Sequence, residues 1–402
     1  MTDGRSAPAA GRATLIAALC LVVTVAYGAL YYGFAVLITD DAAGAEFSRG
    51  LLSTAYGGAV VTSGLMAIPV GRLADRFGVR WIIASGTVVG ATGLLLFSLA
   101  TAGWQVLAVW WLVLGPAIAM TFYEPAYVAI QHAFGPADRA RAIGTLTLTA
   151  GLSGPIFTPA TAGLVEALDW RPTTRLFALA LLACAPVAAL AIRVRPPGHG
   201  APAPRPTGQL ARVVHGRLAV FTLGTVLGYG TLEAVVVHRI ARFEEDGYSL
   251  ATVTTWAAIA GLLTLPGRFA LPVLARRVRS TDVLAAVLLV LAASTALMIS
   301  GGSYAQLAVS FVLFGLVFGA ALPLRAVVMG EWVPTAVFGS AMGAQAALIA
   351  GGRATLPAAA GLMHDALDGY RVTMAMLTAL LLASAVLVAA SGRSAAPVDA
   401  SP

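Results

Sequence analysis

The fold is decided by a short charged stretch between two long apolar runs, Pro69-Val70-Gly71-Arg72-Leu73-Ala74-Asp75-Arg76-Phe77-Gly78-Val79-Arg80-Trp81. Gly71 and Gly78 allow two helices to approach and the chain to turn sharply. We expect the Asp75 carboxylate near the start of the next helix, where the helix dipole stabilises a negative charge. The stretch therefore predicts two membrane-spanning helices joined by a tight loop.

The composition excludes a water-soluble domain. Of the 402 residues, 59% are hydrophobic and 11% are charged, whereas soluble chains carry about 25% charged residues. The mean hydropathy is +0.86. Disorder requires the opposite composition, and the 43 Gly residues show no collagen period. A polytopic membrane protein remains.

Twelve apolar runs are each long enough to cross a hydrocarbon core of roughly 30 Å as a helix. They lie at residues 13–39, 49–71, 80–101, 104–134, 141–166, 172–192, 216–239, 249–274, 281–300, 304–330, 337–362 and 372–391. The first run is too long for a signal-peptide core and has no convincing cleavage site, so we expect it to remain as a span.

The positive charges predict the orientation. All 25 cationic residues are Arg. With the N-terminus in the cytoplasm, sixteen of them, including Arg76 and Arg80, lie on the cytoplasmic side and six lie outside. Because cytoplasmic loops carry the positive excess, both termini are expected in the cytoplasm. The arginines do not cluster on one soluble face, so the net charge of +7 predicts no nucleic-acid partner.

A Pro-, Gly- and Arg-rich segment, residues 193–216, divides the chain. Proline fixes φ and lacks an amide donor, so no regular span is expected there. We predict an N-terminal six-helix bundle at 1–192, a cytoplasmic linker at 193–216, a C-terminal bundle at 217–392 and a cytoplasmic tail at 393–402. The arginines of the linker are expected to contact anionic lipid headgroups.

The two halves are related in sequence. PATAGLVEALDWR at 159–171 matches PAAAGLMHDALDGYR at 357–371, and QVLAVWWLVLG at 105–115 matches QLAVSFVLFG at 306–315. Both pairs lie about 200 residues apart at the same place in the order of spans. Such a parallel repeat predicts a transporter with its binding site near the bilayer midplane between the halves.

Gly71, Asp75, Arg76, Gly78 and Arg80 fit the loop signature G-x-L-x-D-R-x-G-x-R, and the chain resembles the major facilitator superfamily along its whole length. The resemblance implies an all-α integral membrane fold of twelve helices in two six-helix parallel repeats. It also implies that these five residues form a conformational gate, which opens as the halves move. The alternative is that the loop only determines topology. The second copy, at 266–272, lacks the acid.

A finer resemblance covers the first five spans. The segments 32–36, 46–49, 122–127 and 151–155 are similar to the monocarboxylate and oxalate/formate branch of the superfamily. This resemblance implies a small organic anion as the substrate. The segment 151–155 also resembles a degraded Gly-Pro-rich antiporter motif, which keeps efflux open as an alternative.

Charged side chains inside the spans are candidate functional residues, because an ionised group at the bilayer centre costs roughly 2.5–3.5 kcal/mol. Glu233 in span 7 and Arg353 in span 11 are both expected near the midplane. The two could simply neutralise each other. Alternatively, Arg353 binds an anionic group of the substrate and Glu233 exchanges a proton. The resemblance supports the second role, since oxalate/formate carriers place a cation midway along span 11.

The other charged candidates, Glu124, Arg268 and Arg325, lie nearer the cytoplasmic third. The resemblance assigns Arg268 to substrate binding, through a loose correspondence with an arginine of span 8. Glu124 and Arg325 occupy near-equivalent places on spans 4 and 10 and are expected to form a gate or ion pair; Glu124 is also a candidate for proton coupling. Tyr27 and Tyr31 at helical spacing on span 1 are candidates for substrate binding, with aromatic packing or an interface belt as the alternative.

The remaining titratable residues predict no further site. His132 and His238 are expected near the membrane interfaces, and His364 in an outer loop. The two cysteines lie in apolar stretches, so neither a disulfide framework nor a metal site is expected. A nucleotide-binding loop would need Lys, which the chain lacks. We therefore expect no metal and no cofactor.

These observations predict a multi-pass plasma-membrane protein that is a secondary active transporter, not an enzyme. It is expected to work by alternating access, coupled to protons, and to move a small organic anion such as a monocarboxylate. Its partners would be this substrate, protons and the lipid bilayer, and the chain is expected to be monomeric. The nearest alternative is a proton-driven drug or metabolite efflux antiporter on the same fold. A membrane sensor or scaffold would be expected to carry a large soluble appendage.

Overall fold

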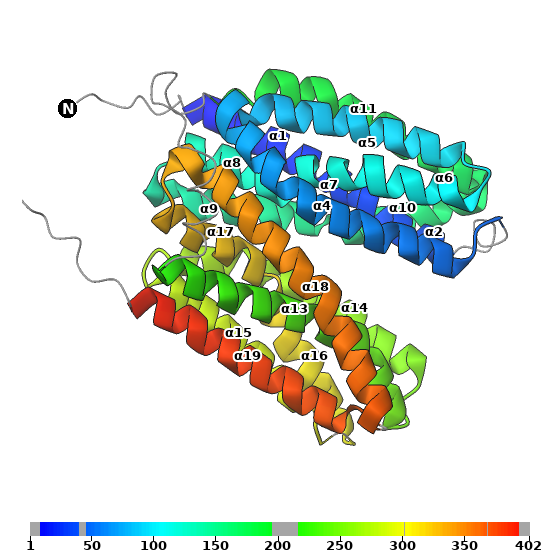
Figure 1. The fold of residues 1–402 in the computed structure, drawn as a ribbon, viewed down its shortest axis with the longest axis vertical. Coiled ribbons are helices and arrows are strands. Elements are labelled where there is room, and N and C mark those ends of the chain that lie inside the picture. The colour runs from blue at the N-terminus through cyan, green and yellow to red at the C-terminus, as the bar shows by residue number, and fades with distance from the viewer. Residues whose placement is uncertain (1–8, 40–45, 195–215, 301, 368, 394–402) are drawn as a thin grey trace, which may run out of the picture. The chain divides into compact units, whose positions relative to one another are not determined.

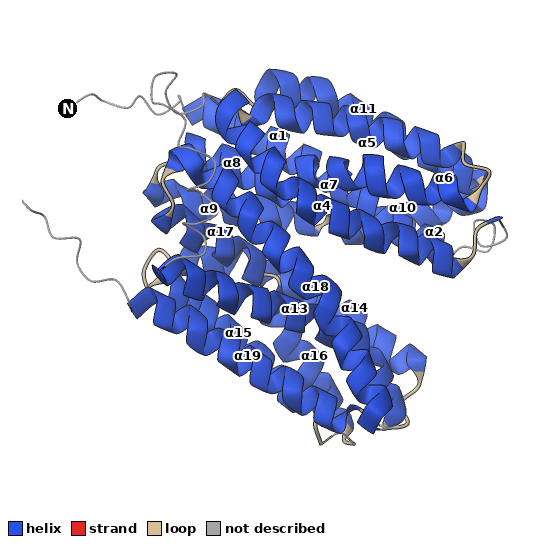
Figure 2. Ribbon diagram, viewed as in Figure 1, coloured by secondary structure: helices blue, strands red, loops and turns tan. Residues whose placement is uncertain are grey.

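A computed structural model describes residues 9–39, 46–194, 216–300, 302–367 and 369–393. Within these ranges the regular structure is helical, without a strand (Figure 2). Most of the predicted linker at 193–216 and nearly all of the predicted tail at 393–402 lie outside the described residues. The all-helical fold predicted from the apolar runs is confirmed.

Helices cover all twelve predicted spans. In the first half they are α1 Ala9–Tyr27, η1 Gly28–Tyr32, α2 Gly33–Thr39, α4 Arg49–Phe77, α5 Val79–Ser98, α6 Gly103–Val109, η2 Trp110–Leu114, α7 Gly115–Thr121, α8 Tyr123–Ala133, α9 Pro136–Gly151, α10 Ser153–Leu168 and α11 Trp170–Ala191. In the second half they are α13 Gly216–Glu245, α14 Leu250–Leu274, α15 Ser280–Ala296, α16 Tyr304–Phe318, α17 Ala321–Trp332, η3 Thr335–Val337, α18 Phe338–Leu367 and α19 Tyr370–Arg393.

Among the described residues, 10 of these spans are long and apolar enough to cross a membrane as one helical segment. The two exceptions have local causes. The fifth span is divided into α9 and α10, of 16 residues each, where the chain passes through Leu152 in the Gly- and Pro-rich segment 151–155. The ninth span, α15, is apolar but has only 17 residues.

The chain divides into two compact units. Unit 1 comprises residues 1–204 and 332–347, and unit 2 comprises residues 205–331 and 348–402. The first turns of α18 therefore belong to unit 1, and the rest of that helix belongs to unit 2. The predicted domain limits at 192 and 217 remain predictions.

In unit 1, α11 packs along α5, α1 packs against α9 and α11, and α4 packs against α7 (Figure 1). One aromatic cluster fills the centre, where the Trp110 and Phe34 rings lie 3.8 Å apart and Phe97 and Trp170 pack around them. In unit 2, α19 packs along α15 and α13, and α14 packs along α16. Each unit thus pairs its helices in the same order along the chain.

Equivalent residues of the repeated segments make equivalent contacts. Gly115 and Gly315 each lie against a backbone carbonyl of the neighbouring helix: a Cβ would lie 2.9 Å from the Ala59 oxygen in α4 and 2.7 Å from the Ala260 oxygen in α14. Without side chains at these glycines, the helix backbones can approach closely.

The first turns of α6 and α16 are also closed in the same way. The Gln105 side chain accepts a hydrogen bond from the Ala102 amide at 3.1 Å, and the Gln306 side chain accepts one from the Ser303 amide at 3.2 Å. Such a bond satisfies one of the amides left open before a helix begins.

Candidate functional site

Glu233 and Arg353 form an ion pair inside unit 2. Arg353 donates from Nε to Glu233 Oε2 at 2.8 Å, and its Nη2 lies 2.8 Å from the same oxygen. Arg353 lies at the middle of α18, and Glu233 lies in the second half of α13. Their side chains are 39% and 35% exposed, so the pair is accessible and not sealed in the core. The structure therefore brings together the two charged residues that depth alone selected.

A close contact between α13 and α18 positions this pair. A Cβ at Gly230 would lie 2.7 Å from the carbonyl oxygen of Gly352, and a Cβ at Gly352 would lie 2.9 Å from that of Val226. Glu233 follows Gly230 by one helical turn, and Arg353 follows Gly352 directly. Because neither glycine carries a side chain, the backbones approach closely enough for the acid and the arginine to meet.

Asp75 binds the first turn of α18 within unit 1. Its Oδ1 accepts from the Gly339 amide at 2.9 Å, and its Oδ2 accepts from the Ser340 amide and hydroxyl, both at 2.7 Å. A carboxylate at these first amides satisfies open donors and meets the positive end of the helix dipole. We expected Asp75 at the start of the next helix along the chain. That was wrong, because Asp75 lies near the end of α4 and caps a helix more than 260 residues later.

Small residues bring α4 and α18 into contact around this cap. A Cβ at Gly339 would lie 2.7 Å from the Gly71 carbonyl oxygen and 2.7 Å from Asp75 Oδ1. A Cβ at Gly343 would lie closer still to the carbonyl oxygen of Ala67. Gly71 thus has the close-approach role expected of it, although the partner is α18.

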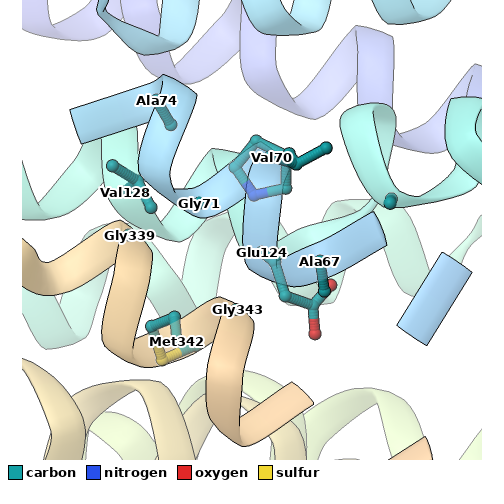
Figure 3. A pocket seen from close by; sticks show the side chains of 11 residues that line it. Ala67, Val70, Gly71, Ala74, Glu124, Val128, Gly339, Met342 and Gly343 are labelled. Carbon is teal, nitrogen blue, oxygen red and sulfur yellow. The ribbon is translucent and has the colours of Figure 1, made fainter. Parts of the chain in front are cut away.

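Glu124 lines a small pocket in unit 1. Figure 3 shows this pocket among α4, α8 and the first turns of α18. Its wall includes Gly71, Glu124, Val128 and Met342, and it holds about 250 Å³, open solvent at its mouth included. Glu124 belongs to the first turn of α8, where the helix dipole favours a negative charge. Even with this open space counted, the volume is below the range of about 300–1,000 Å³ that is usual for ligand sites.

The other gate residues surround the turn between α4 and α5. Gly78 has φ +86° and ends α4, so a residue with a side chain would be strained there. The Arg76 guanidinium lies 5.0 Å from the Phe77 ring centre, and that of Arg80 lies 4.5 Å from the Trp81 ring centre. The positive φ of Gly78 explains the sharp turn, and the gate role of these residues remains a prediction.

The tyrosines of span 1 are part of an aromatic group in unit 1. The Tyr27 ring stacks on Phe122 with 3.8 Å between centres, and Tyr31 meets Tyr56 edge to face at 5.8 Å. Tyr31 is 37% exposed and lies in the π-helical segment η1, a feature that often marks functional sites. Stacking on Phe122 accounts for the position of the Tyr27 ring. A substrate role for Tyr27 or Tyr31 remains a prediction.

Arg268 and Arg325 lie elsewhere in unit 2. A Cβ at Gly319 would lie 2.8 Å from Arg268 Cγ, so the Arg268 stem packs against the end of α16. Arg325 is 1% exposed, inside α17. Glu124 belongs to unit 1 and Arg325 to unit 2. Their predicted pairing and the predicted substrate role of Arg268 remain predictions.

Sequence reasoning did not find the hydrogen-bond partners of two histidines of unit 2. His238, expected at a membrane interface, bonds to the Pro357 carbonyl at 2.9 Å and to the Tyr370 hydroxyl at 3.0 Å. His364 lies in the last turn of α18 and not in a loop, and its Nε2 is 2.8 Å from Glu245. Hydropathy locates such residues along the membrane normal but gives no signal for partners on other helices.

The described residues contain no group of three or more His, Cys, Asp or Glu that could hold a metal ion. Long apolar helices with an accessible acid–arginine pair between two of them are typical of a multi-pass membrane transporter. The chain belongs to the Major Facilitator Superfamily, whose family model matches residues 15–299. Members of this family are transporters and not enzymes, as the sequence predicted.

Of two curated relatives, one is named as a transporter and the other as an efflux protein. One is the MFS transporter asaE of Aspergillus flavus, 26% identical over 317 residues, which cover 75% of this chain and 68% of that protein. The other is the agnestins efflux protein AgnL12 of Paecilomyces divaricatus, 24% identical over 68% of this chain and 62% of that protein. The chain thus matches about two thirds of the length of each.

The fold is similar to that of the human organic anion transporter MFSD10 (TETRAN), with a TM-score of 0.71 and 17% identity. The superposition covers 95% of this chain and 100% of that chain. At this level of identity the likeness shows the shared fold. The comparisons confirm the superfamily that the loop signature indicated, and the monocarboxylate and oxalate/formate branch remains a prediction.

Proposed function

We propose that this protein is a proton-coupled secondary transporter of a small organic anion, such as a monocarboxylate, and works by alternating access in the plasma membrane. The observation that carries the proposal is the Glu233–Arg353 pair. Placing charges among apolar helices costs free energy, which a purely structural core would avoid with apolar residues. A pair that stays accessible is therefore suited to exchanging partners.

The geometry of the pair supports a competition between two carboxylates. Glu233 contacts Arg353 through one oxygen, which faces both Nε and Nη2. A substrate carboxylate offers two oxygens to the forked guanidinium, a strong arrangement for such groups. Glu233, once displaced from Arg353, is available to take up a proton. One anion and one proton would then move together.

We propose further that the Asp75 contact with α18 is the gate of the transporter. The contact consists of three hydrogen bonds from two adjacent residues, so it can break and form as one unit. Gly71 and Gly78 allow the close approach and the sharp turn, and Arg76 and Arg80 flank that turn. Glu124 beside Gly71 and Arg325 in unit 2 are proposed as further gate residues, with Glu124 also available for proton coupling.

The topology is part of the proposal. The equivalent helix pairs in the two units and the matching environments of Gly115 and Gly315 support a duplication in parallel orientation. Together with the excess of Arg in alternate loops, they support two six-helix repeats, residues 1–192 and 217–392, with both termini in the cytoplasm. The protein is proposed to act as a monomer.

The alternative is a proton-driven efflux antiporter on the same fold. It is favoured by the relative named as an efflux protein and by the Gly- and Pro-rich break between α9 and α10. An antiporter would carry protons into the cell as it exports a drug or metabolite. It predicts substrates that are cationic or neutral and increased resistance to toxic compounds in cells that express the protein.

The test is flux into proteoliposomes under an imposed pH gradient, with acetate, lactate, pyruvate and benzoate as probes. Arg353→Ala is expected to abolish uptake. Glu233→Gln is expected to abolish the response to the gradient and to leave exchange of substrate for substrate active. Glu244→Gln and Arg277→Ala, two exposed positions of unit 2, are the matched controls. The proposal is wrong if neither variant of the pair changes the flux of any probe that the wild type moves.

A further inference from the structure

A histidine in the last turn of α18 lies between two carboxylates at one end of unit 2. The His364 Nε2 lies 2.8 Å from Glu245 Oε1, and its Nδ1 lies 3.1 Å from Asp365 Oδ1. Ionised carboxylates only accept hydrogen bonds, whereas a neutral imidazole has one donor nitrogen. Both contacts are therefore satisfied by the imidazolium form of His364, which donates from both nitrogens.

Glu245 connects three helices of unit 2 through these contacts. It is the last residue of α13, and its Oε1 faces His364 at the end of α18. Its Oε2 accepts a hydrogen bond at 3.4 Å from the amide of Tyr370, the first residue of α19. The Tyr370 ring packs against the His364 ring, with 4.2 Å between their centres. We call Glu245, His364 and Tyr370 the unit 2 clasp, because they connect the ends of α13 and α18 to the start of α19.

Unit 1 has an equivalent contact. Glu46 follows the first span, and α11 begins with Trp170, which holds the same place in the repeated segment 159–171 as Tyr370 holds in 357–371. Glu46 Oε1 accepts from the Trp170 indole at 3.3 Å, and Arg171 donates to both Glu46 oxygens. In each half, an acid at the exit of the first span thus binds the start of the last helix.

The two contacts differ in the cation that holds the acid. Arg171 is always charged and lowers the pKa of the Glu46 carboxyl, so this pair keeps both charges between pH 5 and 8. Histidine changes its charge within that range. As the pH rises and His364 loses a proton, one ring nitrogen faces a carboxylate without a hydrogen. The unit 2 clasp is therefore complete in acid and weakened in base.

The other groups that face His364 keep their charge in this range. They come from all three helices: Glu245 from α13, Asp365 from α18 and the Tyr370 ring from α19. Carboxylates and phenols ordinarily titrate outside the range of pH 5 to 8. His364 is thus the group that makes the unit 2 clasp sensitive to pH.

A second histidine lies beside the clasp, but its contacts suit a neutral ring. The His238 Nε2 lies 2.9 Å from the Pro357 carbonyl oxygen, and its Nδ1 lies 3.0 Å from the Tyr370 hydroxyl. With a hydrogen on Nε2, the neutral ring donates to the carbonyl and accepts from the hydroxyl. Both contacts of His238 are therefore complete without an added proton, unlike those of His364.

We propose that the unit 2 clasp is a pH-dependent contact that holds α13, α18 and α19 together when His364 is protonated and weakens as the pH rises. Because α13 carries Glu233 and α18 carries Arg353, the clasp joins one end of the two helices that form the ion pair. In the proposed orientation this end faces the cell exterior, so external acid closes the clasp. The contact of Glu46 in unit 1 is its constant counterpart. This regulation goes beyond the proposed function and does not depend on the substrate.

The test is hydrogen–deuterium exchange of the purified full-length protein in detergent at pH 5 and pH 8. Measured rates are divided by the intrinsic exchange rates at each pH, so that protection of the amides is compared. The first two turns of α19 report on the unit 2 clasp, and those of α11 are the internal control. His364→Arg makes the cation permanent, whereas His364→Gln removes it.

We expect protection in α19 of the wild type to fall about two- to fivefold from pH 5 to pH 8, the effect of an exposed ion pair, while that in α11 stays constant. His364→Arg should keep the higher protection at both pH values, and His364→Gln the lower. A wild-type fall in His364→Arg would overturn the inference, because His238 or another group would then set the response. Equal falls in α11 and α19 of the wild type, or no fall in α19, would also overturn it. The test requires no transport, so its result is independent of the proposed function.

Discussion

Replacing Gly352 with alanine is expected to destabilise unit 2, whereas the same change at the adjacent Gly351 is not. A Cβ at Gly352 would lie 2.9 Å from the Val226 carbonyl oxygen and 3.1 Å from Val226 Cγ1, but a Cβ at Gly351 has nothing within 4 Å. The gain in helix propensity, about 1 kcal/mol, is common to both variants and cancels in their comparison. The remaining difference is the cost of overpacking, about 1–3 kcal/mol.

The expected cost of overpacking sets the difference in melting temperature that the assay must resolve. For a cooperative unit of 150–250 residues, each kcal/mol shifts the melting temperature by about 2–4 °C. The melting temperature of Gly352→Ala should therefore lie at least about 2 °C below that of Gly351→Ala. The measurement is the loss of the monodisperse peak on size-exclusion chromatography after heating the purified protein in detergent.

The same contact predicts a functional effect. Gly230→Ala would place a Cβ 2.7 Å from the Gly352 carbonyl oxygen, so it should lower stability and separate Glu233 from Arg353. Gradient-driven uptake by Gly230→Ala should therefore fall together with its stability, whereas Gly351→Ala should keep the wild-type flux. Equal melting temperatures for Gly351→Ala and Gly352→Ala would refute the reasoning, because the close approach of α13 and α18 would then not be what positions the pair.

Three further predictions test the contacts of unit 1 and the repeat. Asp75→Asn leaves one acceptor oxygen in place of the two that face α18. The lost hydrogen bond costs about 1–2 kcal/mol, so deuterium exchange of the first α18 amides should be about tenfold faster. Unchanged exchange would argue against the cap. The Arg171 guanidinium lowers the pKa of the Glu46 carboxyl, so the pair stabilises the protein at any pH above the ordinary pKa of Glu, and this stabilisation is lost as the pH falls through the lowered pKa. Glu46→Gln should therefore have a lower melting temperature than wild type at neutral pH, with a loss of stability below about 1 kcal/mol at this exposed site. In acid the melting temperatures of the two proteins should become equal. Gly115→Ala and Gly315→Ala should each cost about 1–3 kcal/mol, and a loss in only one of them would contradict equivalent packing in the two halves.

The sequence was sufficient to predict the helices, because a bilayer leaves a spanning chain few alternatives. Backbone groups in lipid must bond within the segment, so an apolar run of about 20 residues forms a helix. Depth along those runs was also sufficient to select Glu233 and Arg353. The division at Leu152 was not predicted, since hydropathy averages over a window and does not resolve a local change of hydrogen bonding.

The partners of the site residues could not be predicted in the same way. The pattern around Asp75 indicated a carboxylate at a helix N-terminus, which was the correct kind of contact, but the helix is α18 and not α5. His238 has partners on α18 and α19 that follow it by more than a hundred residues. Periodicity assigns a residue to a face and a depth, whereas a contact between distant helices depends on packing that one sequence does not specify.

Small residues therefore determine which charges meet. In lipid the hydrophobic effect supplies little attraction between helices, so their packing depends on close backbone approach. Gly230 and Gly352 provide that approach for Glu233 and Arg353, and Gly71 and Gly339 provide it for Asp75 and the first amides of α18. In both places a charged group lies within one helical turn of a glycine contact. A homologue that kept the charges but replaced these glycines with larger residues should lose the contacts, so these contacts depend on the glycines as much as on the charges.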